Sequence, residues 1–180
     1  MFGSIRNKLY LRKLLKNGLR VGNNFNIENG VTIDAIFPWL IEIGDNVTLG
    51  PYARILAHDA STKIHLGYTK LGKVNIGNNV FVGMNVVILP GVTIGNNVVI
   101  GAGSIVTHNI EDNSVVAGNP AKKIIATDVY IENQKDKMNK GYIFDKTYTL
   151  SNNISSKKKN EMKKAITNKN GFIVWFYWEW

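Results

Sequence analysis

Aliphatic residues recur at every sixth position through much of this 180-residue chain. A helix repeats its apolar residues every three to four positions, and a half-buried strand repeats them every two. A spacing of six fits neither element alone, but it fits a very short strand followed by a turn. The positions form three runs, each with constant phase: Val21, Ile27 and Ile33; Ile43, Leu49 and Ile55; and Ile76, Val82, Ile88, Ile94, Ile100 and Val106.

The hexads also contain the residues that tight turns require. In IGNNVF, IGNNVV and IGDNVT, Gly and then Asn or Asp follow the aliphatic residue, and these types accept turn conformations that β-branched residues resist. Three hexads would close one triangular coil, and stacked coils would pair as parallel strands about 4.8 Å apart. The pattern therefore predicts an all-β solenoid, a parallel β-helix in which each coil needs its neighbours. The spacing does not fix its handedness.

Two breaks in the phase interrupt the repeat. The first lies between Ile33 and Ile43 and adds four residues, which are Ile36, Phe37, Pro38 and Trp39. The second lies between Ile55 and Ile76, where the segment AHDASTKIHLGYTKLGK lacks the pattern and is expected to be a loop that leaves the wall of the prism. Loops on a rigid scaffold often contain the functional residues, and this one contains two of the three His residues, His58 and His65.

The flanks differ from the repeats and suggest three parts: 1–17, 18–126 and 127–180. Residues 4–17 are expected to form an amphipathic helix that covers the first coil with Leu9, Leu14 and Leu15. Residues 127–154 have a mixed polar composition. The following SSKKKNEMKKAIT is expected to be helical, with Ser155 or Ser156 as its cap, and the chain ends in the aromatic tail GFIVWFYWEW.

The composition excludes several classes of function. The chain has no Cys, which removes disulfides, thiolate metal ligands and a cysteine nucleophile. Its net charge of +9 is divided between the repeats and the C-terminal part and forms no stripe with aromatic residues, so no nucleic-acid partner is expected. No apolar run reaches the roughly 18–20 residues of a membrane helix, and no secretory signal is evident, so a cytoplasmic location is expected.

Residues 18–126 resemble the hexapeptide-repeat acetyltransferases, above all in VNIGNNVFVGMNVVILPGVTIGNNVVIGAGSIVTHNIEDNSVVAGNPAKKI. Within that family the segment is similar to the sugar O-acetyltransferase branch, which includes galactoside and maltose acetyltransferases and enzymes that decorate bacterial polysaccharides. The resemblance implies a left-handed β-helix and a homotrimer with active sites between subunits. It also implies acetyl-CoA as co-substrate and a saccharide or glycan intermediate as acceptor.

The resemblance also implies catalytic residues. The family's catalytic His lies on the loop that leaves the prism, and His58, 18 residues before Ile76, fits that place. An imidazole can take a proton from a sugar hydroxyl and later return it to a thiolate. The oxyanion of the intermediate would accept a hydrogen bond from the backbone N–H of Met84. Asp59 could orient His58 only if the loop curls back.

Binding residues follow by the same route. For the cofactor, the family positions correspond to Ala102, Gly103, Thr107, Lys122 and Lys123, with His108 at a position where a Lys is common. For the acceptor, the matching positions are Glu28 and Asp34, and His65 could also touch substrate. The family's Asn is not kept at the first of these two, and the loop at 34–42 is two residues longer than the galactoside pattern. The acceptor is therefore expected not to be a simple galactoside.

Other functions remain open at this point. An N-acetyltransferase acting on a nucleotide-linked amino sugar would need the same base. A non-catalytic structural β-helix would display regular Thr ladders, and Thr32, Thr48 and Thr93 form none. A zinc carbonic anhydrase would need three His ligands at one metal, and the spacing of the three His residues does not match, so no metal site is expected. The aromatic tail is expected to pack on its own trimer or to dock on a membrane or a polysaccharide-assembly partner.

Overall fold

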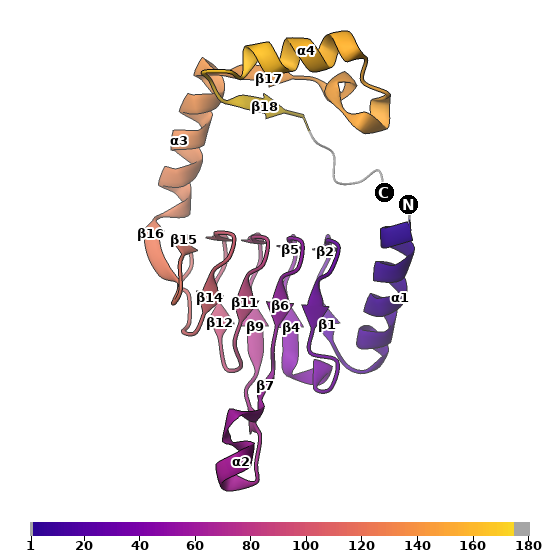
Figure 1. The fold of residues 1–180 in the computed structure, drawn as a ribbon. Helices are drawn as coiled ribbons and strands as arrows, with labels where there is room; N and C mark the ends of the chain where they lie inside the picture. Colours follow the sequence, from indigo (N-terminus) through magenta and orange to yellow (C-terminus); the bar gives the residue numbers. More distant parts are fainter. Residues whose placement is uncertain (1, 175–180) are drawn as a thin grey trace. The chain divides into compact units, whose positions relative to one another are not determined.

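The computed structural model describes residues 2–174, which divide into two compact units, 1–127 and 128–180. Figure 1 shows the elements of both units, and each unit is described by itself. The aromatic residues Trp175, Phe176, Trp178 and Trp180 of the tail lie outside the described residues. Among the described residues, no helix is both long and apolar enough to cross a bilayer.

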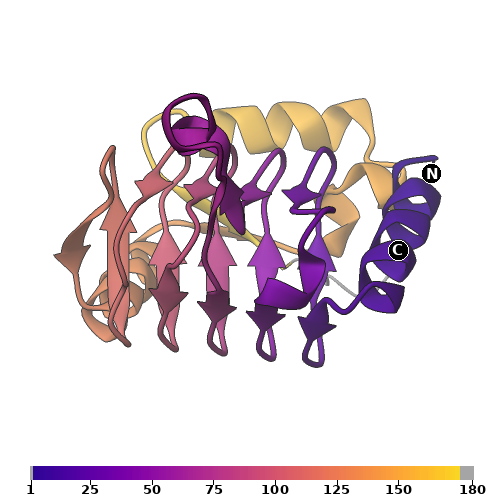
Figure 2. The same ribbon diagram turned by 90° about the horizontal axis from the view of Figure 1, so that it is seen from below.

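Three parallel sheets form the walls of the first unit, and their strands come round in turn along the chain (Figures 1 and 2). Sheet A contains β1 (Arg20–Val21), β4 (Ile41–Ile43), β9 (Val74–Ile76) and β12 (Thr93–Ile94). Sheet B contains β2 (Asn26–Ile27), β5 (Thr48–Leu49), β10 (Val80–Val82), β13 (Val98–Ile100), β15 (Ser114–Ala117) and the antiparallel β16 (Lys122–Ile125). Sheet C contains β3 (Thr32–Ile33), β6 (Arg54–Ile55), β11 (Val87–Ile88) and β14 (Ile105–Val106).

The hexad aliphatics fill the space inside these walls. Ten of the twelve are buried, and the other two, Val21 and Ile27 of the first coil, pack against the same core. In all but the last hexad, the residue two positions earlier, such as Val80, Val86 or Val98, is also apolar and packs inside, whereas the last hexad has the buried Ser104 there. The prediction of a parallel β-solenoid is confirmed, because one inward face on every short strand is what the six-residue period supplies.

The strand pairing between coils shows how many residues each of the two insertions adds. Val80 pairs with Val98, which is 18 residues ahead, so a regular coil has the predicted length. Arg20 pairs with Glu42, 22 residues ahead, because the first insertion lies between them. Ile41 pairs with Val74, 33 residues ahead, because the second insertion lengthens that coil much more. The strands nevertheless stay in phase, so both insertions leave the prism and return to it.

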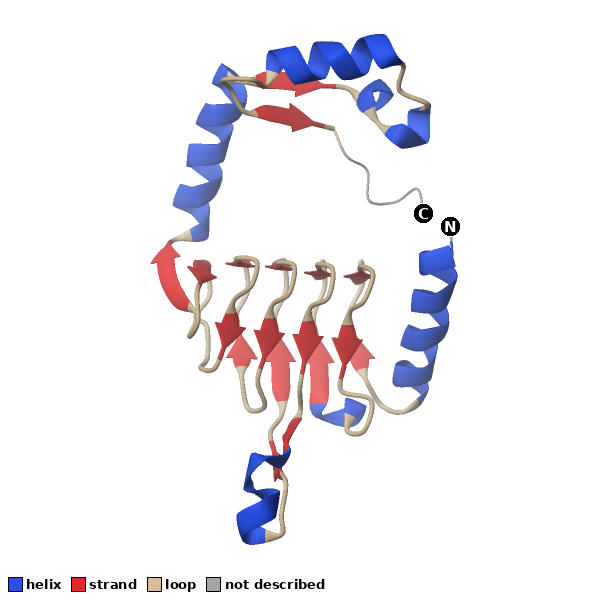
Figure 3. Ribbon diagram, in the orientation of Figure 1, coloured by secondary structure: helices blue, strands red, loops and turns tan. Residues whose placement is uncertain are grey.

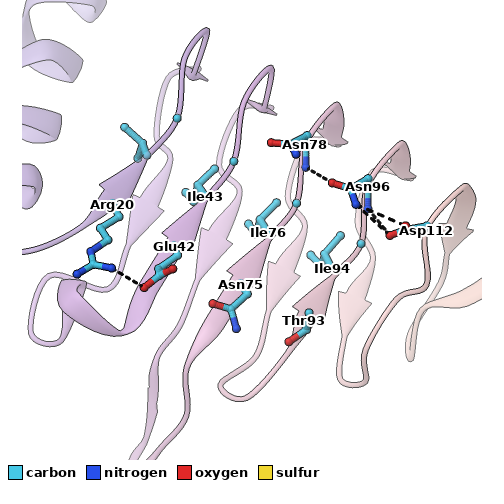
Figure 4. A pocket seen from close by; sticks show the side chains of 15 residues that line it. Arg20, Glu42, Ile43, Asn75, Ile76, Asn78, Thr93, Ile94, Asn96 and Asp112 are labelled. Carbon is cyan, nitrogen blue, oxygen red and sulfur yellow. Dashed lines mark hydrogen bonds and ion pairs between the residues drawn. The ribbon is translucent and has the colours of Figure 1, made fainter.

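The corner between sheets A and B is stabilised by polar ladders, part of which Figure 4 shows. Side-chain amides link Asn24 to Asn46, Asn46 to Asn79 and Asn79 to Asn97 at 2.8, 3.0 and 3.1 Å. A second ladder runs beside it, in which the backbone N–H of Asn78 donates to Asn96 at 2.9 Å. The first ladder's Asn residues have φ near +56°, a region that Asn tolerates better than most side chains.

The helix α1 (Phe2–Lys16) closes the first coil through a different face from the predicted one. The Asn7 amide donates to the carbonyl of Ile27 at 3.3 Å, and the Tyr10 hydroxyl both donates to the carbonyl and accepts from the N–H of Ile33. These contacts satisfy the free edges of β2 and β3. Leu14 is buried as expected, but the expectation was wrong for Leu9 and Leu15, which are 61% and 40% exposed.

The second insertion forms a small arm with its own structure. It contains the antiparallel pair β7 (His58–Asp59) and β8 (Lys70–Leu71), with the 3-10 turn η2 (Ala60–Thr62) and the helix α2 (Lys63–Leu66) between them. Figure 3 shows this arm projecting from the coils. The first insertion is shorter and contains only the 3-10 turn η1 (Pro38–Leu40).

The second unit begins within the helix α3 (Thr127–Lys140), which the mixed polar composition did not predict. It continues through β17 (Tyr142–Phe144), η3 (Lys146–Tyr148), η4 (Leu150–Asn152), α4 (Ser156–Ala165) and β18 (Gly171–Ile173), and β17 pairs in parallel with β18. The predicted helix α4 is present, and its Ser155 cap accepts from the N–H of Lys158 at 3.3 Å. Phe144 is buried beside Tyr148, whose ring lies under the Lys158 ammonium.

Candidate active site

Most of the predicted site residues fall on two different corners of the prism. The BC corner, where sheet B strands turn into sheet C strands, contains Glu28 on the first coil, Met84 on the third, and Ala102 and Gly103 on the fourth. The CA corner, where sheet C strands lead to sheet A, contains the other group: Asp34, His58, Thr107 and His108. A sheet C strand separates the two corners in every coil. One chain therefore presents two groups of predicted residues rather than one.

A buried carboxylate holds the imidazole at the CA corner. The Asp34 Oδ2 atom contacts the Nδ1 atom of His58, and the Asp34 side chain is only 1% exposed whereas that of His58 is 29% exposed. An ionised carboxylate selects the tautomer in which Nδ1 bears the proton and Nε2 has the free lone pair. None of the described residues hydrogen-bonds to Nε2. The ring is therefore arranged to accept a proton from outside the chain.

Asp34 stays ionised because its surroundings supply several donors. Burial by itself would raise the pKa of this carboxyl, but the contact with His58 and the backbone N–H groups of Ala57, Ile36 and Phe37 lower the pKa by more. The N–H of Ala57 donates to Oδ2 at 2.9 Å, and those of Ile36 and Phe37 donate to Oδ1 at 3.0 and 3.2 Å. The pKa of Asp34 therefore lies below its usual value.

These contacts change the role expected for Asp34. The sequence suggested that it holds sugar hydroxyls, but its carboxylate is buried and engaged by four partners of the chain itself. A saccharide could reach it only by displacing one of them. Asp59, which was considered as the orienting residue, points elsewhere: its carboxylate lies 2.7 Å from the Lys70 ammonium and accepts from the N–H of Ser61.

Three other predicted residues lie apart from the imidazole. His65 is on α2 at the far end of the arm, exposed to solvent. His108 is an exposed turn residue whose Nδ1 lies 2.7 Å from the hydroxyl of Thr107, two coils beyond His58. Glu28 is exposed on the BC corner of the first coil. No group of three His, Cys, Asp or Glu side chains in residues 2–174 is arranged to hold a metal ion.

The BC corner offers an open backbone donor at Met84. The carbonyl of Met84 accepts from the N–H of Gly103 at 2.8 Å, which ties this turn to the next coil. Within the described part of the chain, the N–H of Met84 has no acceptor, and the residue is 48% exposed. Gly83 before it has no room for a side chain, since an added Cβ would lie 2.6 Å from the backbone nitrogen of Ala102. The turn is therefore closely packed yet leaves one donor free.

The end of the solenoid brings the predicted lysines to sheet B. The Asn119–Pro120 peptide is cis, and after this turn β16 runs back along β15, with Lys122 opposite Ala117 and Lys123 opposite Val116. The Lys123 ammonium lies 4.0 Å from Glu111, whereas Lys122 has no carboxylate partner among residues 2–174. Gly118 of the same turn donates to the hydroxyl of Ser104 at 3.1 Å. The lysines thus follow a turn that contacts the Ala102–Gly103 coil.

Comparison with known proteins agrees with this architecture. The family model for the bacterial transferase hexapeptide (six repeats) matches residues 73–108. Protein CapG of Staphylococcus aureus is 40% identical over 126 residues, which make up 66% of this chain and 72% of that protein. A hexapeptide-repeat acetyltransferase from Vibrio cholerae O1 biovar eltor, solved in complex with acetyl coenzyme A, is 30% identical with a TM-score of 0.55 over 61% of each chain.

A solved maltose O-acetyltransferase from Clostridium difficile 630 is 35% identical, with a TM-score of 0.51 over 62% of this chain and 72% of that one. The chain therefore belongs to the hexapeptide-repeat acetyltransferase family, and its relatives include sugar O-acetyltransferases. It is an acyltransferase.

Proposed function

We propose that this protein transfers the acetyl group of acetyl-CoA to a hydroxyl group of a saccharide. The observation that carries the proposal is the His58–Asp34 pair, in which a buried carboxylate fixes an imidazole with its Nε2 atom open. The kinship with a maltose O-acetyltransferase supports a saccharide acceptor, and the relative solved with acetyl coenzyme A supports the donor. The same pair would serve an amine acceptor, so amino sugars belong among the substrates to be tested.

The chemistry follows from the open Nε2 atom. It takes the proton of the acceptor hydroxyl while the hydroxyl oxygen forms a bond to the thioester carbonyl carbon. The negative charge then rests on the former carbonyl oxygen, and the N–H of Met84 is the donor proposed to stabilise it. The C–S bond breaks next, and the imidazolium returns its proton to the CoA thiolate. The products are an acetyl ester and free CoA.

A complete site requires more than one chain. Pro90, at the next corner of the same coil, is six residues after Met84, which spans at most about 20 Å of backbone. The sheet C strand Val87–Ile88 lies between the two corners, so we infer that the donor at the BC corner and the base at the CA corner of one chain do not act on the same tetrahedral carbon. We infer a homotrimer in which the CA corner of each subunit faces the BC corner of the next. The left-handed sense of the coil is part of the same prediction.

The acceptor is proposed to be a building block or intermediate of a bacterial surface polysaccharide, modified in the cytoplasm at the inner face of the membrane. One feature of the C-terminal unit supports such a location. Four exposed lysines of α4 have no carboxylate partner among residues 2–174, and the only acidic residue of that helix, Glu161, lies 3.2 Å from the Tyr148 hydroxyl. A basic surface of this kind suits anionic lipid. The four lysines are Lys157, Lys159, Lys163 and Lys164.

The test is acetyl-CoA turnover with a panel of neutral sugars, amino sugars and oligosaccharides. His58→Ala should reduce kcat with the best acceptor by ~10²–10⁴, as loss of a general base does, while CoA still binds. Lys63→Ala on the same arm is the control and should keep the parent rate. Activity of His58→Ala within a few-fold of the parent would refute the assignment. A fully active single chain in light scattering would refute the trimer.

A further inference from the structure

The first insertion places aromatic side chains directly beside the imidazole. The Phe37 ring stands edge-on to the His58 ring, with centroids 5.5 Å apart. The Trp39 ring stands edge-on to Phe37 in the same way, at 5.7 Å. The three rings thus form a continuous row that begins at the proposed base. Neither aromatic residue belongs to the hexads, since both lie in the four-residue excess between Ile33 and Ile43.

The backbone of this aromatic turn, residues 36–39, is held as firmly as the base. The Asp34 carboxylate that contacts His58 through Oδ2 also accepts the N–H groups of Ile36 and Phe37 through Oδ1. Pro38 is buried at the start of η1 and fixes the φ angle there. Trp39 closely approaches Gly18, which follows α1, because a Cβ on Gly18 would lie 2.8 Å from the Trp39 Cβ. One carboxylate therefore fixes the distance between the turn and the imidazole.

The side chains of this rigid turn are nevertheless open. Trp39 is 57% exposed and Ile36 is 61% exposed, whereas Pro38 between them is buried. Large apolar side chains on an anchored backbone are costly to leave in water, and ligand sites are commonly walled by such residues with a few polar groups beside them. At this turn the polar group is the imidazole of His58.

We propose that Trp39 is the platform for the acceptor, on which the apolar C–H face of a pyranose ring stacks while a hydroxyl of the same or the adjoining sugar reaches Nε2 of His58. The proposal rests on the saccharide acceptor proposed above and adds the residue that selects it. A saccharide is the occupant that fits, because it offers an apolar ring face and a hydroxyl within one or two rings, and a single aromatic ring separates Trp39 from the base. The neighbouring subunit is the competing occupant.

The test separates acceptor binding from the rest of the reaction. With the best saccharide of the panel, Trp39→Ala should raise the KM for the acceptor about tenfold and leave kcat and the KM for acetyl-CoA within about twofold. Trp39→Phe should restore most of the loss, since it keeps an aromatic face. Phe81→Ala is the matched control, because Phe81 is an exposed aromatic residue on sheet B, 44% exposed, and should leave every kinetic constant unchanged.

Two results would overturn the proposal. An unchanged acceptor KM in Trp39→Ala would show that the indole does not touch the acceptor. A lower melting temperature together with loss of the assembled mass would show that Trp39 packs against another subunit. If no saccharide in the panel is acetylated by the parent protein, the proposed function itself fails, and that result is distinct from both.

Discussion

The regular coils and the two insertions of this solenoid are built by opposite rules. From Ile76 to Val106 the chain repeats the same strand and turn, in which an aliphatic residue points inward and the next residues form the corner. The insertions between Ile33 and Ile43 and between Ile55 and Ile76 keep none of this pattern. Both leave the prism at the CA corner, on successive coils, and both return in register. The coils supply rigidity, and the insertions supply the proposed base and the aromatic turn.

The insertions depend on the coils because a residue of the wall, Asp34, holds both of them in place. Asp34 is the residue directly after the inward-facing Ile33, so it belongs to the regular wall and is buried like one of its members. Its carboxylate holds residues of both insertions, His58 from the second and the backbone of Ile36 and Phe37 from the first. Both insertions are thereby attached to the rigid wall. We therefore propose that Asp34 positions the imidazole and does not itself touch substrate.

The largest effect is expected where the two regions meet. Asp34→Asn places an amide where the chain presents donors from His58 and from the N–H of Ala57, so one donor loses its partner or the imidazole changes tautomer. The kcat should fall by up to ~10⁴ with little change in either KM, as when an amide replaces the orienting carboxylate of a Ser-His-Asp triad. Steady-state kinetics measure this. A purely structural role would instead lower the amount of folded protein and leave kcat per folded site intact.

The same residue makes a prediction about pH. Because the pKa of Asp34 is lower in the folded protein than in the unfolded chain, its ionised form stabilises the fold above its usual pKa. That contribution is lost as the pH falls below about 4 and through the lowered pKa of the folded state. Melting temperatures measured between pH 3 and 7 should therefore fall more steeply towards acid for the parent than for Asp34→Asn. Parallel curves would show that the carboxylate is not the charged group inferred here.

The sequence predicted the coils well because their determinants are local. Each hexad contains its own inward residue and its own turn residues, so the period alone indicates the walls, the core and the places where the chain departs from them. The spacing of His58 also placed it on the arm. The residues that close the two ends depend on tertiary contacts instead. Tyr10 rather than Leu9 faces the first coil, since the edges of β2 and β3 need polar partners. The positions of the leucines in the helix do not reveal this need.

The Asp34–His58 pair was missed because it spans 24 residues and forms only when the coil closes. A signal was available: Ile33 and Ile55 are each the third hexad aliphatic of their run and pair on adjacent coils, so the residues just after them must be neighbours. The α3 helix had no such signal. Its sequence TDVYIENQKDKMNK lacks an apolar stripe, and none of its residues is buried.

A smaller effect is expected from a residue of the regular coils. Asn79 has φ of +56° and links two neighbours of the ladder, Asn46 and Asn97. Asn79→Ala should lower the free energy of unfolding by about 1–3 kcal/mol, because it loses both amide contacts and because Ala tolerates the left-handed region less well than Asn. Asn79→Gly loses the contacts but tolerates the φ angle, so it should cost less. Denaturant unfolding measures both, and kcat should stay near the parent value. A large loss of activity in Asn79→Ala would contradict the view that this coil residue serves stability and not catalysis.

The smallest effect is expected at the exit from the last coil. Replacement of Lys122 and Lys123 by Ala should raise the KM for acetyl-CoA several-fold and leave kcat at saturation nearly unchanged. The reason is that the CoA phosphates, which these lysines are predicted to contact, are far from the reacting carbonyl and are bound equally well in the ground state and the transition state. Lys123 already has a carboxylate 4.0 Å away in Glu111, whereas Lys122 has none within residues 2–174. The single variant Lys122→Ala should therefore account for most of the change in KM. Lys63→Ala, on the arm, is the control for the loss of one exposed positive charge. A fall in kcat with an unchanged KM would place the lysines nearer the reacting atoms than the end of the solenoid allows.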